Sequence, residues 1–202
     1  MQRRSMLVLV AMLVAQAPGA VQAQVHLTVQ TSLVEHRGHA YDALDPEGAS
    51  LMPATARELG FGVGMDRGTW RVSLTAATSS PDLLVLGDDT GIVTRNVLES
   101  TTLGIAIGPR ILGRRGQAEL HLLAGATINR WSFSYLGDPA RNRTLFTIAA
   151  EGVMPLTGSI RGVMRLEGGF GASLFDQDDL PEGYQTRGAR RVSMAVGLRW
   201  QH

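Results

Sequence analysis

A few groups of residues have types that suit metal binding. His36 and His39 lie three positions apart with carboxylates nearby in EHRGHAYDALD (35–45), and imidazole with carboxylate suits a transition metal. The acidic runs GDD (87–89) and DQDD (176–179) offer the oxygen ligands that calcium prefers. None of these is a strong motif, and a solvated loop is the simpler interpretation of each. We therefore predict no metal site and no cofactor.

A hydrolase that uses a serine nucleophile and a histidine base needs the two within hydrogen-bond distance. Ser100 and His121 share a face of two neighbouring predicted strands. However, a tight turn at Arg114–Arg115 would pair His121 with a position near Gly108. This leaves Ser100 about eight residues further along its strand, on the order of 25 Å away. We therefore predict that the protein is not an enzyme.

The most informative charged residues lie where apolar side chains occupy every second position. Alternation of this kind is typical of a β-strand with one apolar and one polar face. The charged residues lie on the polar face, in the middle of their segments, and we predict a network of arginine to glutamate pairs in which Glu151 lies opposite or diagonal to Arg161. The predicted network is Arg71, Glu119, Glu151, Arg161, Arg165, Glu167 and Arg199.

Alternating segments recur along the whole chain. Their ranges are 25–36, 57–65, 69–78, 97–111, 117–131, 144–154, 159–175 and 190–202. Short connections, expected at Arg67–Gly68, at Arg114–Arg115 and around 155–158, alternate with long polar ones. The long ones are 36–56, 79–96, 136–143 and 176–188. Both chain ends then lie on the side of the short turns, as in an even-stranded up-and-down barrel.

The first 23 residues differ from the rest of the chain. Arg3 and Arg4 precede an apolar run, and AVQA (20–23) offers small residues for cleavage. We predict a signal peptide at 1–23 and a mature domain at 24–202. Without Arg3 and Arg4 the 19 basic and 18 acidic residues become 17 and 18, which argues against nucleic acid as a partner. No later apolar run approaches the roughly 18 residues of a membrane helix. The mature chain is therefore soluble or crosses a membrane as strands.

Two kinds of barrel fit the alternation. A soluble, lipocalin-like barrel would turn its apolar face inward around a ligand, whereas a membrane barrel would turn it toward lipid. Charge in the middle of the polar face favours the membrane barrel. Trp70 and Trp200 lie at the short-turn end of their segments and on the apolar face, which is typical of an interfacial aromatic girdle.

The signal peptide, the eight segments, the loop asymmetry and the terminal segment ending near Trp200 resemble the eight-stranded outer-membrane barrels of the OmpA/OmpX type. The resemblance implies an all-β, antiparallel up-and-down transmembrane β-barrel across 24–202. It also implies a location in the outer membrane, contact with outer-membrane lipid, and assembly by the barrel-assembly machinery.

An eight-stranded barrel has room only for side chains in its lumen. We therefore expect a closed, monomeric barrel with a structural or surface-interaction role, such as membrane integrity, adhesion or loop display. The alternatives are a soluble periplasmic ligand-binding barrel and a lipid-A-modifying enzyme. Arginines near the expected outer rim suit the phosphates of lipopolysaccharide. They are Arg130, Arg141, Arg143, Arg187 and Arg190.

Two details of side-chain placement are predicted. Trp131, Phe133 and Tyr135 have the parity of the luminal face. Either a bulge near Asn129 turns them outward into a second girdle, which we prefer, or they stand above the membrane in an extended hairpin. Glycines on the luminal face of the second segment are expected to make space for long arginine side chains: Gly60, Gly62 and Gly64.

Overall fold

The computed structural model describes residues 23–44, 49–87, 91–95, 97–133 and 140–201. Apart from its last residue, the expected signal peptide (1–23) lies outside the described residues, as does Tyr135. Among the described residues, no helix is long and apolar enough to cross a membrane.

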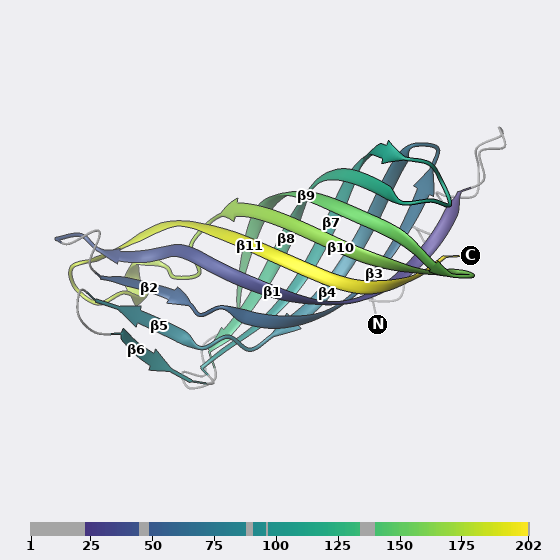
Figure 1. Cartoon of the computed structure of the whole chain (residues 1–202). Coiled ribbons are helices and arrows are strands. Elements are labelled where there is room, and N and C mark those ends of the chain that lie inside the picture. Colours follow the sequence, from purple (N-terminus) through teal and green to yellow (C-terminus); the bar gives the residue numbers. More distant parts are fainter. Residues whose placement is uncertain (1–22, 45–48, 88–90, 96, 134–139, 202) are drawn as a thin grey trace, which may run out of the picture.

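In the described chain, eight strands form a closed antiparallel ring, which confirms the predicted fold class (Figure 1). Each strand pairs with the next, and β11 pairs back on β1 to close the ring. The strands, in ring order, are β1 (Gln24–Asp42), β3 (Ala56–Arg67), β4 (Trp70–Ser79), β7 (Leu98–Gly113), β8 (Glu119–Phe133), β9 (Arg141–Thr157), β10 (Ile160–Gly171) and β11 (Tyr184–Gln201).

The alternation of the sequence becomes an apolar outer face and a polar inner face. On β1, Leu27 is 51% exposed whereas the next residue, Thr28, is 7% exposed. The apolar outer face of β1 extends from Val25 to Leu33, about 26 Å along a strand at about 3.3 Å per residue. A strand tilt of about 40° reduces this to a height of about 20 Å, close to the apolar band of a membrane barrel.

The short turns lie at the end of the barrel where β1 begins and β11 ends, which we call the turn end (Figure 1). The first turn is Gly68–Thr69, one residue later than expected, because Arg67 pairs with Trp70. Gly68 takes the positive φ of 62° that this turn requires. The turn between β9 and β10 is Gly158–Ser159, two residues instead of three to five, because β9 continues to Thr157.

The connection between β7 and β8 is longer than the predicted two-residue turn. It spans residues 114–118, and a bulge lies between Arg110 and Leu112. His121 consequently pairs with Arg110, while Ser100 pairs with Trp131 at the far end of the same two strands. The two candidate residues of a hydrolase are therefore separated along the barrel.

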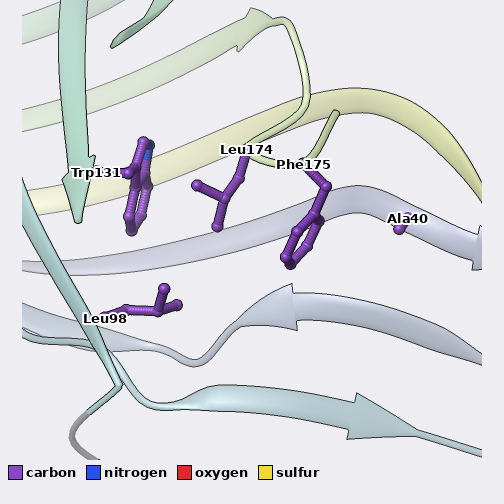
Figure 2. Close-up of a cluster of buried hydrophobic side chains, with 5 residues drawn as sticks. All are labelled: Ala40, Leu98, Trp131, Leu174 and Phe175. Atoms are coloured by element: carbon purple, nitrogen blue, oxygen red, sulfur yellow. The ribbon is translucent and has the colours of Figure 1, made fainter. Parts of the chain in front are cut away.

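The predicted bulge near Asn129 was wrong. β8 keeps a regular register with β7 and β9 on both sides of Asn129, so Trp131 stays on the inner face and is 2% exposed. An apolar residue is accepted inside the barrel here because other apolar side chains surround it. Figure 2 shows Trp131 facing Leu174 and Leu98, with Phe175 beyond Leu174 and Ala40 farther along β1.

These five buried residues form an apolar cluster at the end of the barrel opposite the turns, which we call the mouth. Leu51, Leu83, Phe133 and Leu180 pack against the cluster. Leu174 and Phe175 come from the segment after β10, which therefore folds inward. The mouth cluster covers the polar lumen beneath it.

Two connections expected as polar loops contain strands. β2 (Ser50–Pro53), β5 (Leu83–Leu86) and β6 (Gly91–Thr94) extend the sheet from β1 in the order β1-β2-β5-β6. Figure 1 shows this extension, which we call the flap, at the left beside the mouth ends of β1 and β11. The connection before β11 holds a short 3-10 helix, η1 (Gln177–Asp179).

Candidate functional site

The charged residues of the inner face meet in the middle of the lumen. Arg71, on β4, donates from Nε and Nη2 to the two carboxylate oxygens of Asp66 at 2.6 and 2.7 Å. Its Nη1 donates to Oε1 of Glu151, on the opposite wall, at 2.6 Å. Arg71 therefore connects β3 and β4 to β9 across the lumen.

Glu151 accepts further contacts from two other strands. Arg199 Nη2 donates to Glu151 Oε1 at 2.7 Å, and Arg199 Nε donates to Thr28 Oγ1 at 3.1 Å. Arg165 Nη1 lies 3.6 Å from Glu151 Oε2. One carboxylate thus lies among three guanidinium groups.

A second branch leads toward the mouth. Arg165 Nη2 donates to Oε2 of Glu167 at 2.5 Å, and Arg191 Nη1 donates to Oε1 of the same carboxylate at 2.7 Å. Arg191 Nη2 then donates to Glu58 Oε2, also at 2.7 Å. The ion pairs form one connected set, from Asp66 near the turn end to Glu58 nearer the mouth.

We call this set the luminal network, and its formal charges cancel. None of its members is more than 9% exposed. Burial of single charges would be very unfavourable, but each charge here has an opposite partner. The luminal network comprises the cations Arg71, Arg165, Arg191 and Arg199 and the anions Glu58, Asp66, Glu151 and Glu167.

The structure does not bring all of the predicted charges together. Glu119 lies near the turn end, where it contacts Arg110 at 3.4 Å and His121 at 3.1 Å. Arg161 lies opposite Pro155 and Arg199, so the predicted facing of Arg161 and Glu151 was wrong.

The register of β9 and β10 explains this error. The two-residue turn and a bulge between Ile160 and Arg161 place Glu151 opposite Arg165. Sequence reasoning also missed Glu58, Asp66 and Arg191 as network members. All three have the luminal parity of their strands, and this parity was the available signal.

The glycines of β3 do not make space mainly for arginines. A Cβ atom at Gly64 would lie 2.3 Å from Nε2 of His26, which is 1% exposed. At Gly60 and Gly62 the nearest atoms to such a Cβ would be 3.3 and 3.4 Å away. Gly64 is therefore required by the buried His26, and this corrects the expectation for that position.

Little space is left inside the lumen. A cavity of about 10 Å³ lies between His26, Ser73 and Arg199. This is roughly the volume that one water molecule needs. The lumen is thus filled by side chains at this level.

The two histidines of the first long connection are buried, so the interpretation of this segment as a solvated loop was wrong. A bulge at Gly38 turns His39 to the same side as His36, and the pair is 3% and 5% exposed. The His36 ring lies 5.3 Å from the Trp131 ring, and His39 Nδ1 accepts a hydrogen bond from the Leu174 amide at 2.9 Å. Within the described ranges, no group of three or more His, Asp or Glu residues suits a metal ion.

His39 lies above the apolar band, because the outer face of β1 is already charged at Glu35 and Arg37. Burial lowers the pKa of His39 from 6.5 to about 4. The imidazole is therefore neutral near pH 7. Its backbone has a positive φ of 80°, which is unusual for a residue with a side chain.

Two of the predicted rim arginines have acidic partners. Arg141 pairs with Asp179, with Nη2 to Oδ1 at 2.9 Å, and Arg143 Nη2 lies 2.8 Å from Asp176 Oδ1. Of the two acidic runs considered for calcium, 176–179 thus contacts arginines, whereas residues 88 and 89 of the other run lie outside the described residues. The other three rim arginines are exposed: Arg130, Arg187 and Arg190.

The two tryptophans predicted for an interfacial girdle lie on the outer face near the turn end. Trp70 begins β4 and is 53% exposed, and Trp200 is 47% exposed. Trp200 lies opposite Leu27 on β1 and Ile160 on β10, so its neighbours are also apolar.

A closed eight-stranded ring with an apolar outer face and a charged, filled interior defines the outer-membrane β-barrel fold. Solved structures agree with this. Neisserial surface protein A aligns with a TM-score of 0.58 and 10% identity, over 89% of this chain and 98% of that chain. OprG of Pseudomonas aeruginosa aligns with a TM-score of 0.59 and 8% identity, over 89% and 95%.

A major outer membrane protein of Thermus thermophilus gives a TM-score of 0.50 and 12% identity, over 88% and 99%. No family model matches the sequence, and no curated protein matches it. At these identities the likeness establishes the fold, and it confirms the predicted resemblance to small outer-membrane barrels.

Proposed function

We propose that the protein is a closed outer-membrane barrel with a structural and surface-interaction role, and that it neither conducts solutes nor catalyses a reaction. The luminal network carries this proposal. Its eight charges connect strands on opposite walls, and the cavity between His26, Ser73 and Arg199 has a volume of only about 10 Å³. The mouth cluster adds a second, apolar barrier above it.

The soluble ligand-binding barrel is a weaker alternative. A lipocalin-like barrel needs an apolar interior, whereas here most large apolar residues of the ring lie outside and the buried ones gather in the mouth cluster. Phe61, Phe146 and Phe170, for example, are each 59–60% exposed. Apolar exposure around the whole ring would be unfavourable in water and suits lipid contact.

The partners in this proposal follow from the outer surface. Lipid covers the apolar band, with Trp70 and Trp200 in the inner interfacial layer, and the barrel-assembly machinery inserts the chain. The ring closes within a single chain, which supports a monomer. The flap and the mouth ends of β1 and β11 reach the outside, so they are the parts available for adhesion.

Conductance tests the closed lumen. The mature chain is refolded into planar bilayers in potassium chloride, with an open porin as a positive control. We expect no conductance steps from the folded, heat-modifiable protein. Regular steps of constant size would contradict the proposal, because they require a continuous aqueous path.

Lipid A profiles test the enzyme alternative. A deletion strain and its parent are compared by mass spectrometry of lipid A, with the complemented deletion as a control. Identical profiles are expected. A modification that is lost on deletion and restored by the gene would favour the lipid-A-modifying enzyme.

A further inference from the structure

The barrel wall is interrupted between β1 and the chain that joins β2 to β3. β1 pairs with β3 as far as Val34, opposite Ala56, and with β2 from Ala40, opposite Leu51. Between these points the strands separate around a cavity of about 510 Å³. We call this cavity the wall gap. Its lining includes Glu35, Arg37, Tyr41, Met52, Leu84 and Arg187.

The wall gap opens to the outer side of the barrel. Glu35 and Arg37 continue the outer face of Leu33, and their side chains are 45% and 69% exposed. On the flap, Met52 and Leu84 alternate with Leu51 and Leu83, which pack inward on the mouth cluster. Met52 and Leu84 therefore face outward, on the same side as Arg37.

The height of the wall gap places it at the border between hydrocarbon and headgroups. Leu33 and Leu59 are the last large apolar residues on the outer faces of β1 and β3. The next outward residues toward the mouth are Glu35 and Arg57, both charged. The gap begins directly above this boundary, so a lipid that lies along the apolar band presents its headgroup to it.

One side of the wall gap is basic and the other is apolar. Arg37 and Arg187 supply two guanidinium groups, and the Arg187 guanidinium lies 5.9 Å from the centre of the Tyr41 ring. Glu35 Oε1 lies 2.6 Å from Arg37 Nε, but an ion pair this exposed is weak and does not prevent Arg37 from binding another anion. Arginine binds phosphate through two parallel hydrogen bonds.

We propose that the wall gap binds one phosphate-bearing amphiphile of the outer leaflet. Its phosphate lies between Arg37 and Arg187, and its apolar part lies against Met52 and Leu84. This site differs from Arg141 and Arg143, which have Asp179 and Asp176 as partners. The proposal rests on the proposed function in one respect, since it requires this rim to lie in the headgroup layer.

Calorimetric titration tests the site in the mature chain refolded in dodecyl maltoside. Dodecyl phosphate is the probe, and inorganic phosphate is titrated separately. Arg37→Ala/Arg187→Ala removes both guanidinium groups. Arg95→Ala/Arg114→Ala removes the same charge from exposed positions outside the gap lining and is the matched control. Ser50→Trp fills the gap and keeps both arginines.

We expect saturable binding of one dodecyl phosphate to the wild type and to the control. In Arg37→Ala/Arg187→Ala the affinity should fall roughly tenfold or more, since two charge-assisted contacts are lost. Ser50→Trp should weaken binding similarly, and gel heat-modifiability verifies that each variant is folded. If Ser50→Trp does not fold, the comparison of Arg37→Ala/Arg187→Ala with its control variant tests the site.

Unchanged affinity in Arg37→Ala/Arg187→Ala, or an equal loss in the control, overturns the site. Equal affinity for inorganic phosphate overturns the amphiphile and indicates a soluble phosphate ligand. Conductance is measured independently of this titration. A conducting barrel that still binds dodecyl phosphate would overturn the closed lumen and leave the wall-gap site standing.

Discussion

Glu151 is the residue on which the luminal network depends most. Its two oxygens contact Arg71, Arg199 and Arg165, which come from three other strands. Because the group is 3% exposed, water cannot replace it as a partner for these arginines. Loss of this charge should therefore change the free energy of unfolding strongly, although Glu151→Gln barely alters the shape of the side chain.

Glu151→Gln should destabilise the barrel by about 3 kcal/mol, since it leaves buried arginines without their anion. Urea unfolding in lipid vesicles, followed by tryptophan fluorescence, measures the change. Glu182→Gln removes the same charge at an exposed position and should have little effect. Equal stability of the two variants would show that the network contributes nothing.

His39 gives a prediction for pH. Its pKa is about 4 in the folded protein and 6.5 when unperturbed, so the unfolded chain binds the proton first as pH falls. The contribution of His39 to stability is therefore complete above pH 6.5. It decreases as pH falls toward 4 and is constant below.

His39→Asn should flatten the loss of stability between pH 6.5 and 4, because asparagine does not titrate. Asparagine also accepts the positive φ of this position better than most residues do. Urea unfolding at a series of pH values compares the two slopes, with other titrating groups common to both proteins. Parallel curves would contradict the buried, neutral histidine.

The face of the barrel on which each side chain lies could be predicted from its parity along the strand, but its interaction partner could not. Alternation placed Arg71, Glu151 and Arg199 on the inner face, because a period of two leaves no other choice. It could not select partners, because the position of the β9–β10 turn and the bulge between Ile160 and Arg161 together decide which arginine lies opposite Glu151. Trp131 was placed outside because an apolar residue inside a charged lumen is exceptional, and the cluster that accepts it comes from distant segments.

At the scale of elements, the pairing of β1 with β11 near the mouth depends on the bulge at Gly38. Its φ is 83°, and a Cβ atom there would lie 2.3 Å from the backbone oxygen of Gly188. This close approach holds β1 against β11 above the membrane band. Gly68 also has a positive φ, of 62°, but a Cβ atom there would have no neighbour within 4 Å.

Gly38→Ala should therefore destabilise the protein more than Gly68→Ala does. The left-handed backbone alone costs about 1–2 kcal/mol for a residue with a Cβ. Gly38→Ala adds a clash with backbone that cannot move without breaking the β1 to β11 ladder. Urea unfolding of both variants measures the difference, and a larger loss in Gly68→Ala would contradict the role given to the bulge.

Most elements followed from the sequence, and the exceptions have a common cause. The strands of the ring were predictable because one face of each meets lipid, which enforces alternation over many residues. β2, β5 and β6 have only four residues each, too few for a period to stand out from a polar connection. Their pairing depends on the end of β1 and on the mouth cluster, which no local pattern contains.

For the whole molecule, the ring and the flap should be separable. Replacement of residues 80–97 by Asn-Gly would remove β5 and β6 of the flap, leave β2 in place, and join β4 to β7 through a short loop, because Ser79 lies opposite Ser100. The strand pairs of the ring between Ser79 and the turn end are unchanged. The variant should therefore insert into the membrane and remain heat-modifiable. Adhesion of cells that express the variant should be lower than adhesion of cells that express the wild type. Failure of the variant to insert would contradict the prediction, because it would show that the ring needs these strands to fold.

The orientation of the wall is the central claim, and β11 tests it most directly. The chain has no cysteine, so single cysteines at positions 195 to 199 can carry a spin label without other changes. In vesicles, collision with oxygen from the lipid phase should be high at Val196 and Leu198 and low at Ala195, Gly197 and Arg199. High accessibility to a water-soluble reagent at Val196 and Leu198, or no alternation at all, would contradict an outer-membrane barrel with a closed lumen.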